Sequence, residues 1–381
     1  MSHWISPIHR PLLWCCLFCL VLTGCSPLSP FETPPQQSSC DQEGDPPAAV
    51  TGLMVQPDDG LPSLLREIDA ATCSIDLSVY ILSEPAIIDA LGRARMRGVA
   101  VRVMLEEHPY GGGGTQLDTV DQLESYGIEV RWSGSQTRFS HAKYMVIDDE
   151  VAVIMNQNLT TSAFTTNRDF AVITTSPEEV LQAGVVFERD WNHDEINDPA
   201  GPLILSPTNS RERIVELIDD ANTSIDFYAE IIRDEDIVTA LKRAIDRGVT
   251  VRLIVDRSID EEMRVLLAGL ETGGMDIRLS SSLYIHAKLM IVDGELAVIG
   301  SQNPTATSLD QNREVSMVVT DAVAIERARA IYERDWLLSS PFGAPGQAGT
   351  TSGRNAFHVY RFQSSSDPTI IATAHPASTA C

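Results

Sequence analysis

Short apolar runs alternate with amphipathic stretches along most of this 381-residue chain. In the first half, apolar residues at helical spacing predict helices over 61–70, 85–97 and 116–126. Apolar runs between turn residues predict strands over 74–80, 99–105, 128–132, 144–147 and 151–154. Strands that alternate with helices are typical of layered α/β domains, so we expect an α/β fold.

The second half of the chain repeats the first at a fixed spacing. Four pairs of chemically active residues lie 145 positions apart: His141 and His286, Lys143 and Lys288, Asp148 and Asp293, and Asn158 and Asn303. Ahead of the glycine run at 111–114 the spacing is 150, because the first half carries extra residues there. Repetition over such a length predicts two similar folded units.

Composition divides the chain into five expected segments. Pro and Gly cluster between 197 and 207, which predicts a boundary between two domains there. The segments are a signal peptide over 1–24, a flexible tether over 25–52, an N-terminal half over 53–198, a C-terminal half over 199–340 and a tail over 341–381.

The N-terminus carries export signals. The apolar run from Leu12 to Leu22 is too short for a comfortable membrane span and suits the core of a signal peptide. It ends in Leu22-Thr23-Gly24-Cys25, which resembles the lipobox of bacterial lipoproteins. That resemblance implies a lipid anchor at Cys25 in the bacterial cell envelope, and Ser26 resembles the residue of lipoproteins sent to the outer membrane. An uncleaved signal anchor or an ordinary secretory peptide stays open as an alternative.

Three cysteines, Cys40, Cys73 and Cys381, would remain beside the lipidated one after export. An odd number of thiols in an oxidising compartment favours one bridge and one leftover thiol. A bridge between Cys40 and Cys381 would join the two flexible ends and leave Cys73, just before an apolar strand, as a buried thiol, although the pairing of the three stays open. The spacing of the cysteines offers no metal motif, and we expect neither a metal nor a cofactor.

The charge of the chain limits its partners. It holds 28 basic and 53 acidic residues, which gives a formal net charge of −25. Such a surface repels polyanions, which disfavours DNA and RNA as partners. A local basic pocket can still persist inside an acidic shell.

The repeated motif gathers its polar groups on one side of a strand. Side chains two apart on an extended segment point to the same face, so His141 and Lys143 are expected side by side. The following turn brings the next strand back antiparallel, which returns Asn156 and Asn158 toward them. The second copy repeats this with Ser301 and Asn303. A centre shared by both halves would hold two imidazoles and two ammonium groups, which is the equipment for attacking a phosphate ester.

The spacing His-x-Lys-x4-Asp, followed by Gly-Ser-x-Asn, resembles the signature of the phospholipase D superfamily. The second half matches in full with Gly300 and Ser301, whereas the first half has Met155-Asn156 in their place. The resemblance covers residues 55–338. It implies two similar α/β sandwich halves with mixed sheets, related by pseudo-twofold symmetry, and an active site at their interface.

The resemblance also implies a metal-independent mechanism. One imidazole attacks phosphorus to form a phosphohistidine, and the other protonates the leaving alcohol. His141 is implied as the nucleophile, although the symmetric residues alone leave that order open. The implied catalytic group is His141, Lys143, Asp148, Asn158, His286, Lys288, Asp293 and Asn303, and the supporting group is Asn156, Ser301, Asp169 and Glu314. Of these, Asp148 and Asp293 are expected to pair with a neighbouring lysine or to tie the turn rather than to touch substrate.

These residues favour a phosphodiester hydrolase or a phosphatidyl transferase that acts on phospholipids, because a lipid-anchored protein meets lipid head groups directly. Whether water or an alcohol accepts the group stays open. An extracytoplasmic endonuclease of the same superfamily is the alternative, against which the net charge speaks, and a catalytically inactive scaffold is a third. We expect a monomeric catalytic unit whose partners are a phospholipid or other phosphodiester and, through the anchor, a membrane.

Four flanking residues are expected to be structural. Trp191 and Trp336 close equivalent helices and are predicted to anchor the core. Arg168 and Arg313 each precede an acidic residue of the supporting group. We expect them to form structural ion pairs in preference to phosphate contacts.

Overall fold

The computed structural model describes residues 51–110 and 116–343. The expected lipidation site Cys25, the tether up to residue 50, the glycine run at 111–114 and the tail after residue 343 lie outside the described residues. Within the described residues, the chain forms two mixed sheets of eight strands each, with helices packed against them.

The N-terminal half provides the first seven strands and five helices of the described chain. The strands are β1 (Thr51–Gln56), β2 (Ser74–Val79), β3 (Ala100–Leu105), β4 (Glu129–Trp132), β5 (Tyr144–Ile147), β6 (Val151–Met155) and β7 (Asn167–Thr174). The helices are α1 (Gly60–Ala70), α2 (Pro85–Arg97), α3 (Leu117–Ser125), α4 (Thr161–Thr165) and α5 (Pro177–Trp191).

The C-terminal half follows the same order with two short additional strands, β12 and β16. The strands are β8 (Ile204–Ser206), β9 (Ser224–Ala229), β10 (Thr250–Val255), β11 (Asp276–Leu279), β12 (Tyr284–Ile285), β13 (Lys288–Val292), β14 (Leu296–Gly300), β15 (Glu314–Val319) and β16 (Ser340–Pro341). The helices are α6 (Ser210–Asp219), α7 (Glu235–Asp246), α8 (Glu261–Thr272), α9 (Ala306–Asp310) and α10 (Ala322–Leu338).

The two sheets share one strand order. Neighbours in the first sheet follow β1-β7-β6-β5-β2-β3-β4, and those in the second follow β8-β15-β14-β13-β9-β10-β11, with β16 beyond β11. The strands β2, β3 and β4 run parallel to one another, as do β9, β10 and β11. The remaining pairs in these two orders are antiparallel. The expected fold class of two similar α/β halves with mixed sheets is therefore confirmed.

Local capping chemistry fixes where helices leave the strands. Helix α2 begins behind Glu84, whose side chain accepts a hydrogen bond from the Ala86 amide. It ends at Gly98, whose φ of 99° glycine adopts without strain. The equivalent helix α7 begins behind Asp234, whose side chain accepts from the Ile237 amide. Site residues lie in the short segments between β2 and α2 and between β9 and α7.

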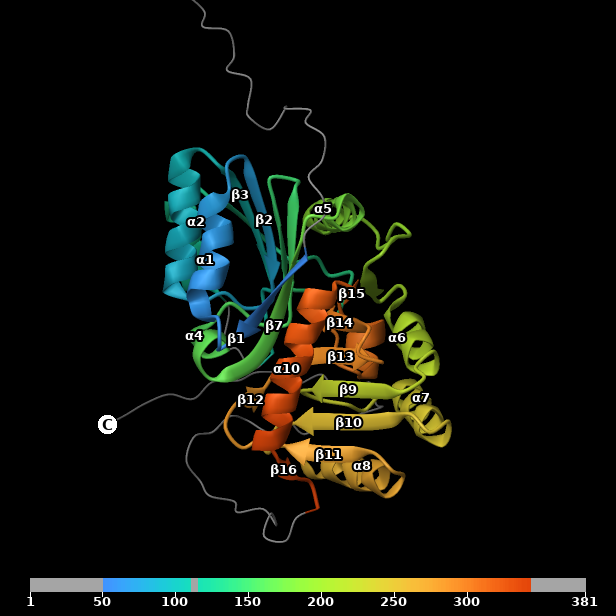
Figure 1. Cartoon of the computed structure of the whole chain (residues 1–381). Coiled ribbons are helices and arrows are strands. Elements are labelled where there is room, and N and C mark those ends of the chain that lie inside the picture. The colour runs from blue at the N-terminus through green and yellow to red at the C-terminus, as the bar shows by residue number, and fades with distance from the viewer. Residues whose placement is uncertain (1–50, 111–115, 344–381) are drawn as a thin grey trace, which may run out of the picture. The chain divides into compact units, whose positions relative to one another are not determined.

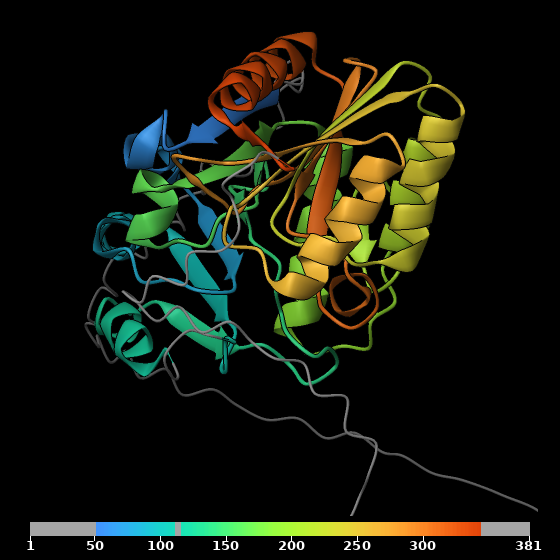
Figure 2. The same cartoon turned by 90° about the horizontal axis from the view of Figure 1, so that it is seen from below.

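Three apolar clusters hold the layers together. One face of the first sheet packs on α1, α2 and α3, and one face of the second packs on α6, α7 and α8. The remaining faces share a single cluster with α5 and α10 that includes Trp191 and Trp336, which confirms both tryptophans as core anchors. Figure 1 shows α1 and α2 beside the first sheet and α6, α7 and α8 beside the second, and Figure 2 shows α10 (red) next to β1 (blue).

Each half pairs a short segment with a strand of the other half. Strand β12 of the C-terminal half lies parallel to β7 of the N-terminal half. In the reciprocal position, Ser140 forms a parallel bridge with Arg313. These segments directly precede His286 and His141, so each histidine is fixed against the strand of the opposite half.

Two buried arginines bind carboxylates across the boundary between the halves. Arg168 Nε lies 2.6 Å from Asp335 Oδ2, and Arg313 Nε lies 2.8 Å from Asp190 Oδ2. Arg313 also binds both carboxylate oxygens of Asp198, each at 2.7 Å. Their guanidinium groups are occupied by carboxylates within the fold, which confirms the structural ion pairs expected from the sequence.

Cys73 corrects one expectation. The sequence predicted a buried thiol, but Cys73 is half-buried and disulfide-bonded. It stands in the turn between the exposed Thr72 and the start of β2, and not inside the strand. No other cysteine is among the described residues, and the expected bridge between Cys40 and Cys381 falls outside them.

Candidate active site

Each of the two repeated histidines is hydrogen-bonded to a carboxylate of the opposite half. His141 Nδ1 lies 2.8 Å from Glu314 Oε2, and His286 Nδ1 lies 2.7 Å from Asp169 Oδ1. Both acidic side chains are fully buried, whereas the side chains of His141 and His286 are 15% and 10% exposed. A carboxylate at Nδ1 favours the proton on that nitrogen, which leaves Nε2 of each ring to attack or to exchange a proton.

Pairing between strands of the two halves explains why each histidine contacts a carboxylate of the opposite half. The His141 amide donates to the Arg313 carbonyl at 2.9 Å, and Glu314 is the next residue along β15. On the other side, β12 runs along the start of β7, two residues before Asp169. The sequence located both carboxylates, but it did not predict which histidine each would contact, because that depends on pairing between the halves.

The two lysines lie beside their histidines in unequal surroundings. Lys143 Nζ donates to the His141 carbonyl at 2.5 Å, and Lys288 Nζ donates to the His286 carbonyl at 2.6 Å. Lys288 Nζ also lies 2.6 Å from Glu230 Oε2. No carboxylate in the described part of the chain forms an ion pair with Lys143, so its ammonium group is the one without a local counter-ion.

Glu230 is a site residue that the sequence analysis missed. Its carboxylate accepts a hydrogen bond from the Tyr284 hydroxyl at 3.0 Å and from Asn303 Nδ2 at 3.4 Å, and it lies 3.8 Å from His286 Nε2. Its counterpart at the spacing of 150 is Tyr80. The repeat therefore does not reveal Glu230. The sequence feature that could have pointed to it is a carboxylate directly after the buried strand β9.

Asn303 lies at the site, where its Nδ2 contacts Glu230, and Asn158 is its counterpart in the first half. The side-chain oxygens of both are buried and accept no hydrogen bond within the described residues. The same holds for Asp169 Oδ2. Unpaired buried polar atoms are costly, and these three belong to residues of the repeated motif and of the supporting group.

The departure from the signature in the first half is accommodated locally. Met155 is buried in the apolar cluster beneath the first sheet, whereas a Cβ at the equivalent Gly300 would lie 2.3 Å from Ser316 Cα. Asn156 is fully buried and donates to the carbonyls of Gly300 at 2.7 Å and Lys288 at 3.1 Å. Its counterpart Ser301 bonds with the backbone of Val315. Both side chains therefore bind backbone, and Asn156 ties the two halves together.

Asp148 and Asp293 lie away from the histidines. Asp148 follows β5 and accepts hydrogen bonds from the amides of residues 72, 73 and 74 at 2.7–2.8 Å. Asp293 follows β13 and accepts from the amides of residues 222, 223 and 224. Lys143 and Lys288 lie at the opposite ends of these strands, roughly 15 Å away at the usual rise per strand residue. Of the two expected arrangements, the aspartates adopt the one that ties the turn.

Burial shifts the protonation of the first-half pair. Burial, together with the charges of Lys143 and Lys288, lowers the pKa of His141 to about 4 against the opposing effect of Glu314. Burial lowers the pKa of Lys143 to about 7, with Lys288 contributing to the shift. His141 is therefore neutral at physiological pH, as a nucleophile must be, and Lys143 titrates close to neutrality.

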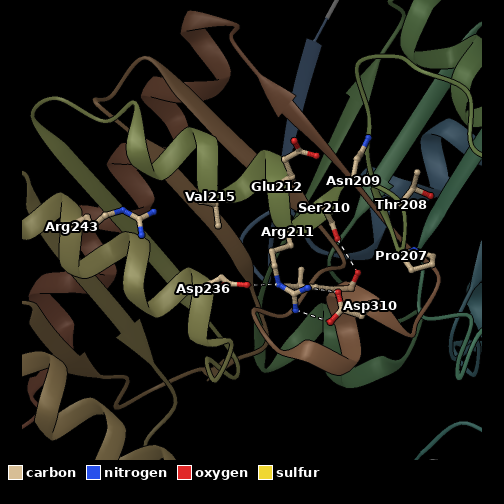
Figure 3. Close-up of a pocket in the computed structure, with 11 residues that line it drawn as sticks. Pro207, Thr208, Asn209, Ser210, Arg211, Glu212, Val215, Asp236, Arg243 and Asp310 are labelled. Atoms are coloured by element: carbon tan, nitrogen blue, oxygen red, sulfur yellow. Dashed lines mark hydrogen bonds and ion pairs between the residues drawn. The ribbon is translucent and has the colours of Figure 1, made fainter.

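A separate pocket of about 380 Å³ lies at the start of α6 (Figure 3). It is lined by Ser210, Arg211, Asp236 and Asp310, among others, and by none of the repeated site residues. Arg211 is held there by Asp310 and by Asp234. Its guanidinium group is therefore neutralised by protein carboxylates.

The described residues contain neither a cluster of potential metal ligands nor a helix suited to span a membrane. In residues 51–110 and 116–343, no group of three or more His, Cys, Asp or Glu side chains is arranged to hold a metal ion. Over the same residues, no helix combines the length and the apolar character needed to cross a bilayer. The expectation that the chemistry needs no metal stays a prediction.

One family model matches both halves of the chain. The family is described as "Cardiolipin synthase, PLD-like domain", and the matched stretches are residues 64–191 and 214–336. Each stretch contains one complete copy of the repeated motif.

Two similar proteins carry cardiolipin in their names, one as a synthase and one as a hydrolase. Cardiolipin synthase of Geobacillus kaustophilus is 26% identical over 324 residues, which cover 72% of this chain and 64% of that protein. The mitochondrial cardiolipin hydrolase of Homo sapiens is 33% identical over 131 residues, which cover 34% of this chain and 50% of that protein. This chain therefore spans less than two thirds of the length of the Geobacillus relative.

A solved structure has a similar fold. The crystal structure of phosphatidylserine synthase from Haemophilus influenzae matches with a TM-score of 0.62 at 12% identity, covering 76% of this chain and 87% of that one. At this identity the likeness shows the fold alone. The duplicated His-x-Lys motif, the two matching sheets and the family match to both halves together show that this chain belongs to the phospholipase D-like family.

Proposed function

We propose that the protein is a phosphodiester hydrolase or phosphatidyl transferase that acts on phospholipids through a covalent phosphohistidine. The observation that carries this proposal is the pair of imidazoles, each hydrogen-bonded to a buried carboxylate of the opposite half and each beside a lysine. Two such rings supply one nucleophile and one acid for displacement at phosphorus, and the chemistry needs no metal.

In the first step, His141 Nε2 attacks phosphorus and a bond to the leaving alcohol breaks. His286 gives its Nε2 proton to the departing oxygen, so the alcohol leaves neutral and the phosphoryl group stays on His141. Lys143, Asn158 and the second-half counterparts hold the non-bridging oxygens and stabilise their charge.

In the second step, water or another alcohol attacks the phosphohistidine. His286 now accepts the proton of the attacking hydroxyl, and the bond between phosphorus and His141 breaks. With water the overall reaction is hydrolysis, and with an alcohol it is transfer. The proposal places Asp148 and Asp293 outside the reaction, because their carboxylates are bound to backbone amides at the far ends of β5 and β13.

The choice of phospholipid draws on the relatives and on the charge of the chain. One similar protein is a cardiolipin synthase and another a cardiolipin hydrolase by name, and a net charge of −25 opposes the approach of a polyanion such as DNA. Because one chain supplies both histidines and both carboxylates, the proposed catalytic unit is a monomer. An endonuclease is the competing function, and an inactive scaffold is the third.

The test of the reaction uses purified residues 26–381 with labelled phosphatidylglycerol, labelled cardiolipin and single- and double-stranded DNA, each with chelator present. We expect lipid turnover that survives the chelator, and a loss of at least about 1,000-fold in His141→Ala and in His286→Ala. Cleavage of DNA alone would favour the endonuclease, and no turnover of any substrate would favour the scaffold. Unchanged turnover in either variant would refute the paired-imidazole mechanism.

We also propose that Cys25 carries a lipid that anchors the mature protein in the bacterial cell envelope, in the outer membrane. The support is the lipobox-like sequence before Cys25 and the serine after it. A buried acyl chain gains about 0.8 kcal/mol per methylene, so two or more chains hold a protein firmly. Labelled fatty acid is expected to enter the wild type and not Cys25→Ser, and an unlabelled wild type would contradict the anchor.

A further inference from the structure

The two halves of the site carry a different charge at one repeated position. Glu230 and Tyr80 occupy equivalent places directly after β9 and β2. The histidine, lysine and asparagine of each half are otherwise identical in type. Any difference in the chemical roles of the two histidines therefore has its nearest structural cause at this position.

On the second-half side, Glu230 brings a negative charge to the reactive face of His286. Its carboxylate lies 3.8 Å from His286 Nε2, the nitrogen not engaged by Asp169. The charges of Lys288 and His286 lower the pKa of Glu230 against the effect of burial, so it is ionised. Glu230 in turn raises the pKa of Tyr284, whose hydroxyl stays protonated and donates to it.

On the first-half side, Tyr80 brings an aromatic ring in place of a charge. Its ring centroid lies 4.6 Å from that of His141 in an edge-on arrangement. Lys143 Nζ lies 5.0 Å from the same ring. The ring helps to bury His141 without offering a counter-charge to its imidazolium form, so the neutral form is favoured there.

We propose that Glu230 is a positioning residue whose carboxylate favours the charged form of the His286 ring and so selects His286 as the general acid, with His141 as the nucleophile. This inference rests on the proposed function, because it assigns roles within that mechanism. A carboxylate near an imidazole stabilises the charged ring by Coulomb attraction. That attraction is strong when the two groups are 3.8 Å apart, as here, and shielded from bulk water.

The remaining charges around His286 do not reproduce this asymmetry. Asp169 at Nδ1 is matched by Glu314 at the other ring, and Lys288 is matched by Lys143. On the facing loop, Asp256 receives the Ile285 amide at 3.3 Å, and its counterpart Glu106 receives the Ser140 amide at 2.8 Å. These charged groups match pair by pair between the halves, which leaves Glu230 as the unmatched charge among the described residues.

The first experiment measures imidazole titration by NMR in the full mature chain labelled at histidine. In Glu230→Gln, which keeps the shape of the side chain, the midpoint of the His286 titration is expected to fall by about one pH unit. The His141 midpoint is expected to move by less than half as much. Glu230→Asp, which restores the charge, is expected to recover most of the shift.

The matched control is Glu333→Gln, which removes one negative charge from a surface ion pair with Arg252. It is expected to leave both midpoints in place. An unchanged His286 midpoint in Glu230→Gln, or equal shifts of both rings, would overturn the inference. This readout needs no substrate, so it decides the role of Glu230 even if no lipid is turned over and the proposed function fails.

The second experiment compares leaving groups. From a p-nitrophenyl phosphodiester, the leaving group p-nitrophenolate departs without being protonated. From an alkyl phosphodiester, the leaving alkoxide needs a proton from the general acid. In Glu230→Gln, release of the alkyl alcohol is expected to slow by about tenfold or more at pH 8, and the burst of nitrophenol by less than about threefold. Equal slowing of both substrates would show a general structural role and would contradict the proposal.

Discussion

The carboxylates that hold the two histidines are contributed across the boundary between the halves. Glu314 and Asp169 are fully buried, and each accepts the Nδ1 proton of the ring from the opposite half. An amide in either position could present its N–H to Nδ1 and stabilise the wrong tautomer, with the proton on Nε2. The orientation of the ring and the location of its proton are thus set by one acidic side chain each.

This leads to a prediction for Asp169→Asn and Glu314→Gln. Each substitution keeps the shape of the side chain, and each is expected to lower kcat by at least about 100-fold while KM changes little. Steady-state kinetics on a soluble phosphodiester measures both parameters. Glu188→Gln, a surface carboxylate paired with Arg102, is the matched control, and equal effects in control and test would contradict the orienting role.

A second prediction concerns Lys143 and pH. Its pKa of about 7 means that the ammonium form is lost as the pH rises through neutrality. Sulfate keeps a constant charge over this range, so its affinity for the site is expected to fall above pH 7, by up to tenfold per pH unit. Calorimetric titration measures the dissociation constant. The pH dependence is expected to disappear in Lys143→Met, and a wild-type affinity constant from pH 6 to 9 would rule the idea out.

At the scale of residues, the sequence located what is repeated. The histidines, lysines and asparagines were identified by their spacing, and the structure places each histidine beside its lysine and against Asp169 or Glu314. Glu230 could not be identified in this way, because its counterpart is Tyr80 and only one half has the carboxylate. The function of Asp148 and Asp293 depends on the direction in which the turn presents them, which spacing does not encode.

At the scale of elements, the turns after β5 and β13 bind the neighbouring strands β2 and β9 through an aspartate side chain each. Asp148 and Asp293 have φ values of 56° and 54°, a left-handed conformation that turns the side chain toward the neighbouring strand. Each carboxylate caps three consecutive amides at the start of β2 or β9. These hydrogen bonds help to fix the register of β2, which is followed by Tyr80, and of β9, which is followed by Glu230.

Asp293→Ala is therefore expected to reduce stability rather than to remove a reacting group. Loss of the capped amides is expected to cost about 1–3 kcal/mol of unfolding free energy in urea denaturation. Backbone hydrogen bonds lower the pKa of Asp293 to about 2 against the effect of burial. Its stabilising contribution is thus present above pH 4 and is lost as the pH falls toward 2. Unchanged stability with abolished turnover would instead assign Asp293 to the chemistry.

Most elements of the first half were predicted from the periodicity, whereas β12 of the second half was not. The pattern predicted a strand over 144–147, and β5 covers the same residues. Strand β12 has only two residues and exists because β7 of the other half lies beside it. A strand that depends on a distant partner has no apolar run of its own, so a local pattern gives no sign of it.

At the scale of the whole molecule, two buried ion pairs hold the halves in register. Arg168 binds Asp335, and Arg313 binds Asp190, so each half contributes one arginine and one carboxylate. Tyr228 also donates its hydroxyl to Asp335 at 2.8 Å. Reciprocal ion pairs therefore support the pseudo-twofold arrangement of the site. The sequence analysis expected structural ion pairs for both arginines, but it did not identify the carboxylates that they bind.

Arg168→Met is expected to lower the free energy of unfolding by about 3–5 kcal/mol, because it leaves Asp335 buried without its cation. Chemical denaturation of the mature chain gives this value. Arg93→Met breaks a half-exposed pair with Asp69 and is expected to cost less than about 1 kcal/mol. Similar costs in both variants would show that the pair between the halves has no special role in stability.

The central claim is that both halves act on a single phosphorus, with His141 as the nucleophile. The covalent adduct is measured in His286→Asn by rapid quenching and mass spectrometry of the intact chain and its peptides. The substrate is a p-nitrophenyl phosphodiester, whose leaving group p-nitrophenolate departs without a general acid. The account predicts one phosphoryl adduct per chain, located on His141, and none in His141→Asn. An adduct on a residue other than His141, or turnover in both variants without any adduct, would contradict it.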